Sequence, residues 1–413
     1  MKKATLGLAM AALLCLVGTA GAATFTAPDG TQDWDNDDNW DTTYPDAVGA
    51  AAAFPEPSGG GSQNIDLNIE ITVGTITFTN TGDTINLNVG TSGSLVFDNS
   101  GSGAMLTMGS RGNNINVDVT LDDDLTVDWA EDTSGNLKIT GVISGAGKTL
   151  TKKGDGRLDL DPGDVGTALA NVVIEAGDLT IDDGGVGSAN VALQAGSFRM
   201  SQNGTYSNSV SLEGNAMMGS AGNRSVTYDG TITESGGSYQ VTWRNERSST
   251  PSSLSTSLTI GAANDYSGGT VVSHGSSNLW STDFAADGCV GSGDVTLEDE
   301  NANIRIVGGT TDTIADTASL YLTNAVVDLG EGPVTKYSLV QLDEGVNETI
   351  GGLYFDGVAQ ALGTWGATGS GATYTNNDYF RGTGVLNVVP EPATMVMLGL
   401  GGVGLLIRRR RRS

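Results

Sequence analysis

Short apolar runs separated by glycine- and asparagine-rich turns are the feature that most constrains the fold of this 413-residue chain. Runs such as Ile69–Val73, Thr84–Val89 and Leu125–Trp129 alternate apolar with polar residues, which is typical of strands with one buried and one wet face. Helical periodicity is absent outside the two terminal segments, and 61 glycines supply turns at close intervals. The sequence therefore predicts an all-β fold, and a turn interval of roughly ten residues fits a sandwich and a solenoid equally well.

The charge balance restricts the partners. The full chain has a formal net charge of −28, and the body without its two terminal segments carries 13 basic and 47 acidic residues. No basic patch is available to displace counterions, so nucleic acid is excluded as a direct partner. The acidic exterior serves solvation alone or favours cations and cationic surfaces. Once the first 22 residues are removed Cys289 is the one cysteine left, so no internal disulfide forms.

Two glycine-rich stretches favour the solenoid. Residues 140–160 read TGVISGAGKTLTKKGDGRLDL, and Asn264–Val272 reads NDYSGGTVV. These stretches resemble the two halves of the autotransporter-associated β-strand repeat, although they lie far apart in this chain. A Leu-x-Leu strand inserts two side chains inward, and Gly-x-Gly permits a sharp corner. The resemblance implies a right-handed parallel β-helix (solenoid), in which each coil buries its face on its neighbours.

The predicted organisation has five parts. Roughly 13 coils of about 20 residues, at ~4.8 Å per coil, would give a rod of about 65 Å. The parts are a signal peptide (1–22), an N-terminal cap segment (23–60), a β-helix of degenerate repeats (61–330), a C-terminal β cap (331–388) and a sorting and anchor segment (389–413).

The first 22 residues predict export. Lys2 and Lys3 form a positive n-region, Leu6–Val17 is apolar, and Ala20–Ala22 is a small-residue cleavage site. We expect cleavage after Ala22 or Ala23, which places the body outside the cytoplasm.

The C-terminal segment has three parts in a row. Pro390, Glu391 and Pro392 form a polar kink, and the uncharged run Ala393–Ile407 follows it. That run would make roughly 22 Å of helix, short for a bilayer core of roughly 30 Å, so we expect a short transmembrane helix. Five arginines then favour the cytoplasmic side: Arg408, Arg409, Arg410, Arg411 and Arg412.

This order resembles the PEP-CTERM sorting signal of bacteria that secrete exopolysaccharide. The resemblance implies an exosortase-type processing enzyme as a partner and transient insertion in the inner membrane. It also implies a location in the cell envelope, at the cell surface or in the extracellular matrix of a diderm bacterium.

Two tryptophans lie six residues apart in an Asp-rich loop near the mature N-terminus. Trp34 and Trp40 either cap the open end of the β-stack or form a stacking platform for a glycan. The Asp run suggests Ca²⁺, but the EF-hand pattern counted from Asp33 fails, with Asp38 in place of glycine and Tyr44 in place of glutamate. We therefore predict no metal and no other cofactor, with Ca²⁺ as the one alternative.

Motifs of common enzymes are missing or incomplete. The run Gly145–Thr149 lacks the first glycine of a phosphate loop, and strand residues follow it where a helix is required. His274 is the single histidine and is expected in a solvated turn, which leaves a Ser-His-Asp triad improbable. Solvated turns are also the expected place of the aspartate triplet Asp122–Asp124 and the aspartate pair Asp182–Asp183.

Three functions compete. The first is a non-catalytic structural or adhesive surface protein that associates with exopolysaccharide. The second is a polysaccharide lyase or hydrolase, whose basic group would come from the cluster Arg199, Arg224, Arg244 and Arg247. Residues 201–256, which hold three of these arginines, are the region long and irregular enough to build a groove. The third is a carbohydrate-binding module that uses Trp34, Trp40, Trp243 or Trp365. The lack of complete enzyme motifs in the sequence favours the first function, that of a non-catalytic structural or adhesive protein.

Overall fold

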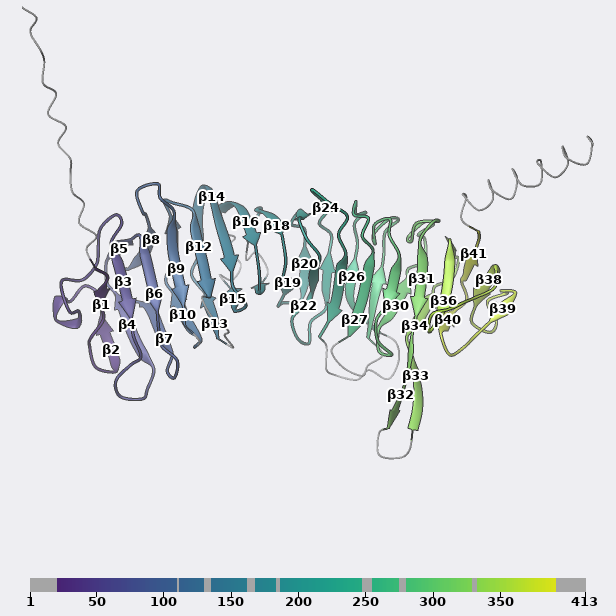
Figure 1. Cartoon of the computed structure of the whole chain (residues 1–413), viewed down its shortest axis with the longest axis horizontal. Coiled ribbons are helices and arrows are strands. Elements are labelled where there is room, and N and C mark those ends of the chain that lie inside the picture. Colours follow the sequence, from purple (N-terminus) through teal and green to yellow (C-terminus); the bar gives the residue numbers. More distant parts are fainter. Residues whose placement is uncertain are drawn as a thin grey trace, which may run out of the picture.

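The chain winds into an elongated parallel β-solenoid, seen from the side in Figure 1. The computed structural model describes residues 21–109, 111–129, 135–161, 168–182, 186–246, 255–274, 280–328 and 333–390. In these residues the sheets are parallel along almost their whole length, and the one helical element is the single 3₁₀ turn η1 (Asp37–Asn39). The predicted all-β solenoid is thus confirmed, while its right-handed winding stays a prediction.

Sheet 1 forms one long side of the rod in its N-terminal half. Its path runs from β1 to β24, and the file β5–β8–β11 joins that path at the long strand β14. The strands are β1 (Ala23–Thr24), β3 (Ala51–Phe54), β5 (Glu70–Val73), β6 (Thr75–Phe78), β8 (Ser94–Phe97), β9 (Ala104–Met108), β11 (Val119–Leu121), β12 (Leu125–Trp129), β14 (Ile143–Lys153), β16 (Ala168–Ile174), β18 (Asn190–Leu193), β21 (Val210–Leu212) and β24 (Ile232–Glu234).

Sheet 2 runs along the whole rod and carries the candidate site on its outer face. All of its pairs are parallel except the last, β36 with β37. Its strands are β2 (Gly30–Asp33), β4 (Gln63–Leu67), β7 (Ile85–Val89), β10 (Asn113–Asn116), β13 (Asn136–Ile139), β15 (Arg157–Leu160), β17 (Asp178–Ile181), β19 (Ser197–Met200), β22 (Ala216–Ser220), β25 (Val241–Asn245), β27 (Thr270–His274), β29 (Val295–Leu297), β31 (Ser319–Leu322), β36 (Gly352–Phe355) and β37 (Val358–Ala359).

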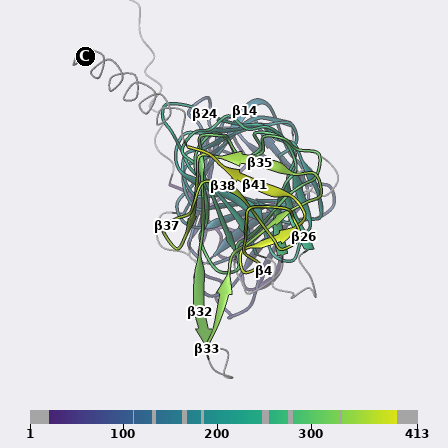
Figure 2. The same ribbon diagram turned by 90° about the vertical axis from the view of Figure 1, so that its right-hand side faces the viewer.

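Sheet 3 forms a further side in the C-terminal half, and Figure 2 shows the closed cross-section end-on. Its strands are β20 (Gly204–Tyr206), β23 (Val226–Tyr228), β26 (Ser255–Ile260), β28 (Trp280–Phe284), β30 (Asn303–Ile306), β34 (Leu339–Leu342) and β40 (Phe380–Gly382). The region 201–256, expected to be irregular, therefore carries strands of regular coils; its residues 247–254 lie outside the described residues.

The core is a column of apolar side chains stacked coil on coil. Leu137, Leu158, Leu179, Phe198 and Met218 are register partners on successive strands of sheet 2, and each is fully buried. Each side chain packs on the coils before and after it, so burial of this column stabilises the stack in the way predicted for a solenoid.

The predicted glycine corner lies between β14 and β15. Gly154 has a φ of +68°, a conformation that a residue with a side chain rarely adopts. A Cβ atom on Gly156 would lie 2.3 Å from Nε1 of Trp129. The motif therefore uses glycine both for the backbone turn and for the close approach to an indole of the previous coil, and Thr149–Leu160 forms strand, glycine turn and strand as expected.

An aromatic cluster closes the N-terminal end. The rings of Trp34 and Trp40 have centroids 5.1 Å apart, and Phe54 stacks on Phe78 at 5.3 Å. Nε1 of Trp34 donates to the carbonyl oxygen of Pro45 over 3.0 Å. Parallel pairing already starts at Ala23, ahead of the predicted first coil at residue 61.

The C-terminal end is closed by a small sheet that includes antiparallel pairing. Its strands are β35 (Asn347–Ile350), β38 (Gly363–Gly366), β39 (Tyr374–Thr375) and β41 (Val385–Val388). Phe355 packs edge-on against Trp365, with ring centroids 5.5 Å apart. The solenoid's parallel pairing extends to β40, well past residue 330.

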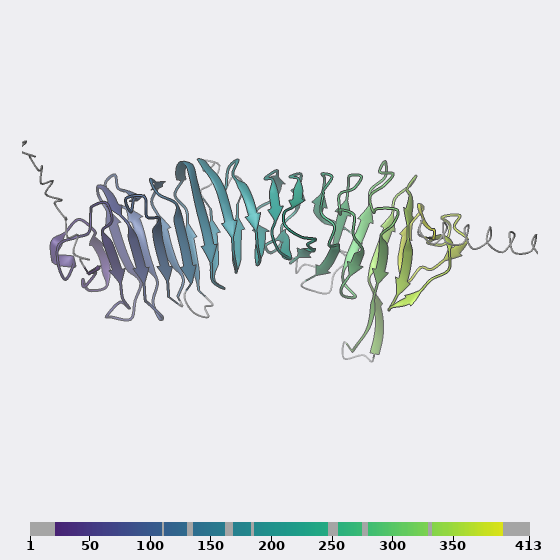
Figure 3. The same cartoon turned by 45° about the horizontal axis from the view of Figure 1, so that its top comes forward.

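One hairpin leaves the rod sideways, as Figures 1 and 3 show. Strands β32 (Asn324–Asp328) and β33 (Pro333–Tyr337) pair only with each other, antiparallel. Beneath them the N–H of Ser338 donates to the carbonyl oxygen of Thr323 over 3.0 Å, so the coil closes at the hairpin's base. The sequence analysis did not anticipate this insertion.

Candidate functional site

The tryptophans considered for glycan stacking lie in the core. Trp34 is fully buried, Trp40 is 5% exposed, and Trp243 is fully buried. Their ring faces are covered by other side chains, as in the contact of Trp243 with Tyr228 at 5.6 Å. A stacking platform needs an open ring face, so the burial of Trp34 and Trp40 favours the cap alternative over the glycan contact.

His274 is not the solvated turn residue that we expected. It ends strand β27 and is 8% exposed, and neither ring nitrogen has a hydrogen-bond partner in the described part of the chain. Burial lowers the pKa of this imidazole to about 4, so it is neutral at physiological pH. No triad can be built on it from the described contacts.

Two of the expected solvated aspartates are buried as well. Asp123 is 7% exposed and accepts the backbone N–H groups of Asn99 and Gly101 over 2.6 and 2.9 Å, which lowers its pKa. Asp182 is 1% exposed. These carboxyl groups satisfy backbone donors and neighbouring side chains at the corners between strands.

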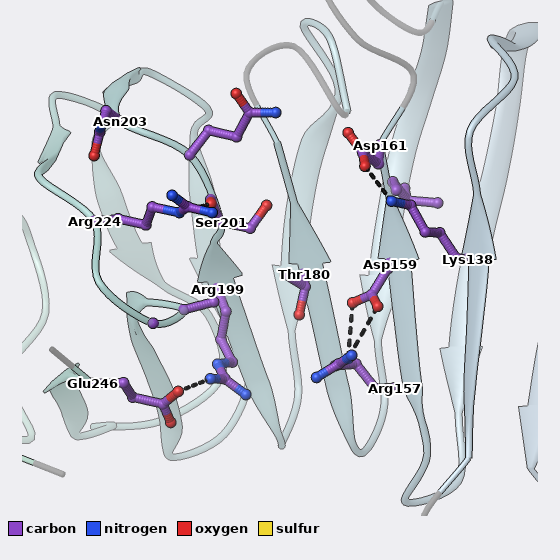
Figure 4. Close-up of a pocket in the computed structure, with 14 residues that line it drawn as sticks. Lys138, Arg157, Asp159, Asp161, Thr180, Arg199, Ser201, Asn203, Arg224 and Glu246 are labelled. Atoms are coloured by element: carbon purple, nitrogen blue, oxygen red, sulfur yellow. Dashed lines mark hydrogen bonds and ion pairs between the residues drawn. The ribbon is translucent and has the colours of Figure 1, made fainter. Parts of the chain in front are cut away.

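A polar groove lies on the outer face of sheet 2 (Figure 4). Its volume is about 810 Å³. We call it the polar groove. It is lined by Lys138, Arg157, Asp159, Leu160, Asp161, Thr180, Arg199, Ser201, Gln202, Asn203, Ala221, Gly222, Arg224 and Glu246.

The strand register lines up the floor of the polar groove. Lys138, Asp159, Thr180 and Arg199 are register partners on β13, β15, β17 and β19. Each occupies the outward position between two inward apolar residues, because side chains alternate along a strand. One residue per coil thus builds a straight file of polar side chains along the rod.

Ion pairs hold most of the charged side chains. Nζ of Lys138 lies 2.5 Å from Asp161 Oδ2, and Nε of Arg157 lies 2.9 Å from Asp159 Oδ1. Figure 4 shows these pairs on one side of Thr180 and the pair of Arg199 with Glu246 on the other. The groove therefore presents fixed donors and acceptors in alternation.

Arg199 spans an intervening coil to reach Glu246. It belongs to β19, whereas Glu246 follows β25, and β22 lies between them. The β22 partner of Arg199 is Gly219, which has no side chain to block the crossing. A Cβ atom there would lie 1.9 Å from the carbonyl oxygen of Arg244. Arg199 also lies 3.4 Å from Asp178 Oδ2, so it bridges two carboxylates.

Two carboxyl groups meet at the edge of the groove. A side-chain hydrogen bond with Asp182, together with the ammonium of Lys138, lowers the pKa of Asp161. Gln202 Nε2 lies 3.4 Å from Asp182 Oδ2. Asp161 is therefore charged at neutral pH.

The predicted basic cluster is partly assembled. Arg199 and Arg224 line the polar groove, and Arg224 Nε donates to the carbonyl oxygen of Ser201 over 2.5 Å. Arg244 lies 3.5 Å from Glu246, which is itself a residue of the polar groove. Arg247 lies outside the described residues.

Three further observations concern metal ligands, membrane-spanning helices and the cysteine thiol. Within them, no group of three or more His, Cys, Asp or Glu side chains could hold a metal ion, and no helix is long and apolar enough to span a bilayer. Cys289 is fully buried, and burial raises the pKa of its thiol to about 12. Residues 1–20 of the predicted signal peptide and the segment from Glu391 to Arg412 lie outside the described residues.

Comparison with known proteins identifies the C-terminal segment. Residues 388–412 match the PEP-CTERM protein-sorting motif. No curated protein and no solved structure matches the chain. The sorting motif implies export through an exosortase system, and it indicates an exported, cell-envelope-associated protein of a Gram-negative bacterium.

Proposed function

We propose that this chain is a non-catalytic structural protein of the cell surface or extracellular matrix, which associates with exopolysaccharide and acts in adhesion. The observation that carries the proposal is the sorting motif at residues 388–412 on a rod that is closed at both ends. Capped solenoids expose long side faces and few free strand edges, which suits display of an extended surface without self-association.

We also propose that the coils derive from autotransporter-associated repeats. The motif Gly-Lys-Thr-Leu-Thr-Lys-Lys-Gly-Asp-Gly-Arg-Leu-Asp-Leu coincides with the end of β14, the corner at Gly154 and Gly156, and the strand β15. The motif's glycines and leucines thus occupy the positions that a solenoid corner and an inward-facing strand require.

Location and processing test the proposal. Cells are fractionated, and the protein is analysed by mass spectrometry in the envelope, the matrix and the medium. We expect a mature chain that begins near Ala23 and has lost Arg408–Arg412. A matched variant with Pro390 and Pro392 replaced by alanine should accumulate with its tail intact. Wild-type protein recovered in the medium with the arginines still attached would contradict it.

A second candidate function, polysaccharide cleavage, has one specific observation in its favour. Asp161 and Asp182 share a hydrogen bond at the polar groove, and Lys138 lies against Asp161. Glycosidic acid–base chemistry uses two neighbouring carboxyl groups, one as the acid and one as the base or nucleophile. The test is release of reducing or unsaturated ends from neutral and acidic polysaccharides by wild type and by Asp161→Asn. Cleavage that Asp161→Asn abolishes would replace the structural proposal.

A further inference from the structure

We propose that the polar groove is a binding site for an uncharged, hydroxyl-rich glycan chain that lies along the rod axis across several coils. This inference rests on the proposed association with polysaccharide and assigns it to one face of the molecule.

The first argument is the pattern of the lining. Donor and acceptor side chains alternate from Lys138 and Asp161, through Arg157 and Asp159, to Arg199 and its carboxylate partner. A sugar hydroxyl both donates and accepts, so each ion pair can bind one hydroxyl through a guanidinium or ammonium N–H and a carboxylate oxygen. Strands of a sheet lie ~4.8 Å apart, so these ion pairs lie along the axis at intervals of one or more coils.

The second argument is the rigidity of these groups. Asp159 accepts from Nδ2 of Asn136 over 3.0 Å as well as from Arg157, and Arg199 is 15% exposed between its two carboxylates. Side chains that are already fixed lose little conformational entropy when a ligand binds. The groove is thus organised before any glycan arrives.

Thr180 supplies an independent indication. It lies in the middle of the file, between Asp159 and Arg199 in Figure 4, and is 6% exposed. Its hydroxyl has no hydrogen-bond partner within the described part of the chain. Buried hydroxyl groups almost always have a partner, so an unmatched one on the groove floor points to a polar ligand.

Charge decides the class of glycan. The lining holds four basic residues and three acidic ones, and the ion pairs already place carboxylates against Lys138, Arg157 and Arg199. The chain as a whole has a formal net charge of −28, so it repels a polyanionic glycan. The basic side chains that could bind such a glycan are already paired with carboxylates. An uncharged chain avoids both costs.

Affinity electrophoresis of the purified mature chain tests the inference. Native gels contain a neutral polymer (dextran, mannan or hydroxyethylcellulose) or an acidic one (alginate or polygalacturonate). We expect retardation by at least one neutral polymer that persists in salt. Arg199→Gln should weaken this binding about tenfold or more, and Thr180→Val about threefold to tenfold.

Matched variants control for folding. Arg305 bridges Asp283 and Asp343 on sheet 3 as Arg199 bridges two carboxylates on sheet 2, so Arg305→Gln removes a similar network elsewhere and should leave binding unchanged. Thr151→Val on the outer face of sheet 1 is the control for Thr180→Val. Circular dichroism confirms that each variant is folded.

Three results overturn the inference. If only acidic polymers retard the protein, and salt abolishes that retardation, the glycan is not an uncharged one. If neutral polymers still bind after both Arg199→Gln and Thr180→Val, the binding site is not the polar groove. The structural role survives either of these. Retardation by none of the polymers refutes the inference together with the proposed exopolysaccharide association, and leaves the envelope location standing.

Discussion

Inside the solenoid, Nζ of Lys152 lies 4.3 Å from the centre of the Trp129 ring. The ammonium also donates to the carbonyl oxygens of Lys153 and Gly154 over 2.8 and 2.6 Å, and to that of Ala176 over 3.2 Å. Lys152 is fully buried, and burial lowers its pKa from 10.5 to about 8. A charged lysine thus ties three carbonyl groups and an indole of adjacent coils together.

Lys152 gives the protein a stability increase at alkaline pH. The folded pKa lies below the unfolded one, so between pH 8 and 10.5 the unfolded chain binds more protons and the folded state becomes relatively more stable. Lys152→Met should remove this rise, up to about 3 kcal/mol. Urea midpoints of both proteins at pH 7.5 and 10.5 measure it. The neighbouring Lys153→Met, at an exposed pair with Glu175, should behave like wild type.

His274 has a dependence of the same sign at acidic pH, because its folded pKa is also lowered. Its folded pKa of about 4 lies below the ordinary value of 6.5, so the unfolded state takes up the proton first as the pH falls. The contribution of neutral His274 to the free energy of unfolding is fully present above pH 6.5 and decreases as the pH falls to 4. His274→Leu should make the decrease shallower than in wild type, and Ser273→Ala should not. Equal slopes for wild type and His274→Leu in urea titrations between pH 7 and 4.5 would contradict the buried, unpaired imidazole.

The N-terminal aromatic cluster should be required for stability and unimportant for glycan binding. Trp34→Ala leaves a cavity at the end of the core and should cost about 3–5 kcal/mol. Tyr374→Ala, at a ring that is 38% exposed, should cost far less. Thermal unfolding followed by circular dichroism gives the comparison. If Trp34→Ala left stability intact but abolished binding to a neutral polymer, Trp34 would be a stacking residue after all.

The hairpin of β32 and β33 should be dispensable for the fold. Asn324 and Tyr337 contact the rod at the base of the hairpin, through Asp356 and Tyr379, so the deletion keeps them. Replacing residues 326–335 by two glycines should change the unfolding free energy by less than about 1 kcal/mol. Deleting the buried strand β31 instead should abolish cooperative unfolding. A deletion of residues 326–335 that unfolds as readily as the β31 deletion would show that the outer part of the hairpin packs on the coils.

Much of the fold follows from local sequence. Inward leucines and glycine corners are visible in the stretch 140–160, because each coil obeys the same alternation and the same turn chemistry. The hairpin was missed because the run Ser319–Leu329 looks like one repeat strand, although β31 ends at Leu322 and β32 begins at Asn324. The burial of His274 was missed because a polar residue at a strand end gives no local sign of what packs over it.

The polar groove could not be located from sequence for a different reason. Its floor depends on which outward residues share a register, and the coil length varies: 21 residues separate Leu137 from Leu158, whereas 29 separate Trp243 from Val272. If the length of one coil is assigned wrongly, the register partners of every residue in the later coils change. Arg157 and Arg199 both occupy outward positions of similar strands. That shared position was the one feature of the sequence that could have indicated the polar groove.

The stacking of coils also fixes how the rod responds to tension. The hydrogen bonds between coils run along the axis, so a pull on the two ends loads each bond along its length and separates coils one at a time from an end. A freed coil of 21 residues extends to roughly 70 Å, against ~4.8 Å in the stack. A rod held at its C-terminal end in the envelope and at the polar groove by a polymer would therefore lengthen stepwise under load, absorbing shear before its attachments fail.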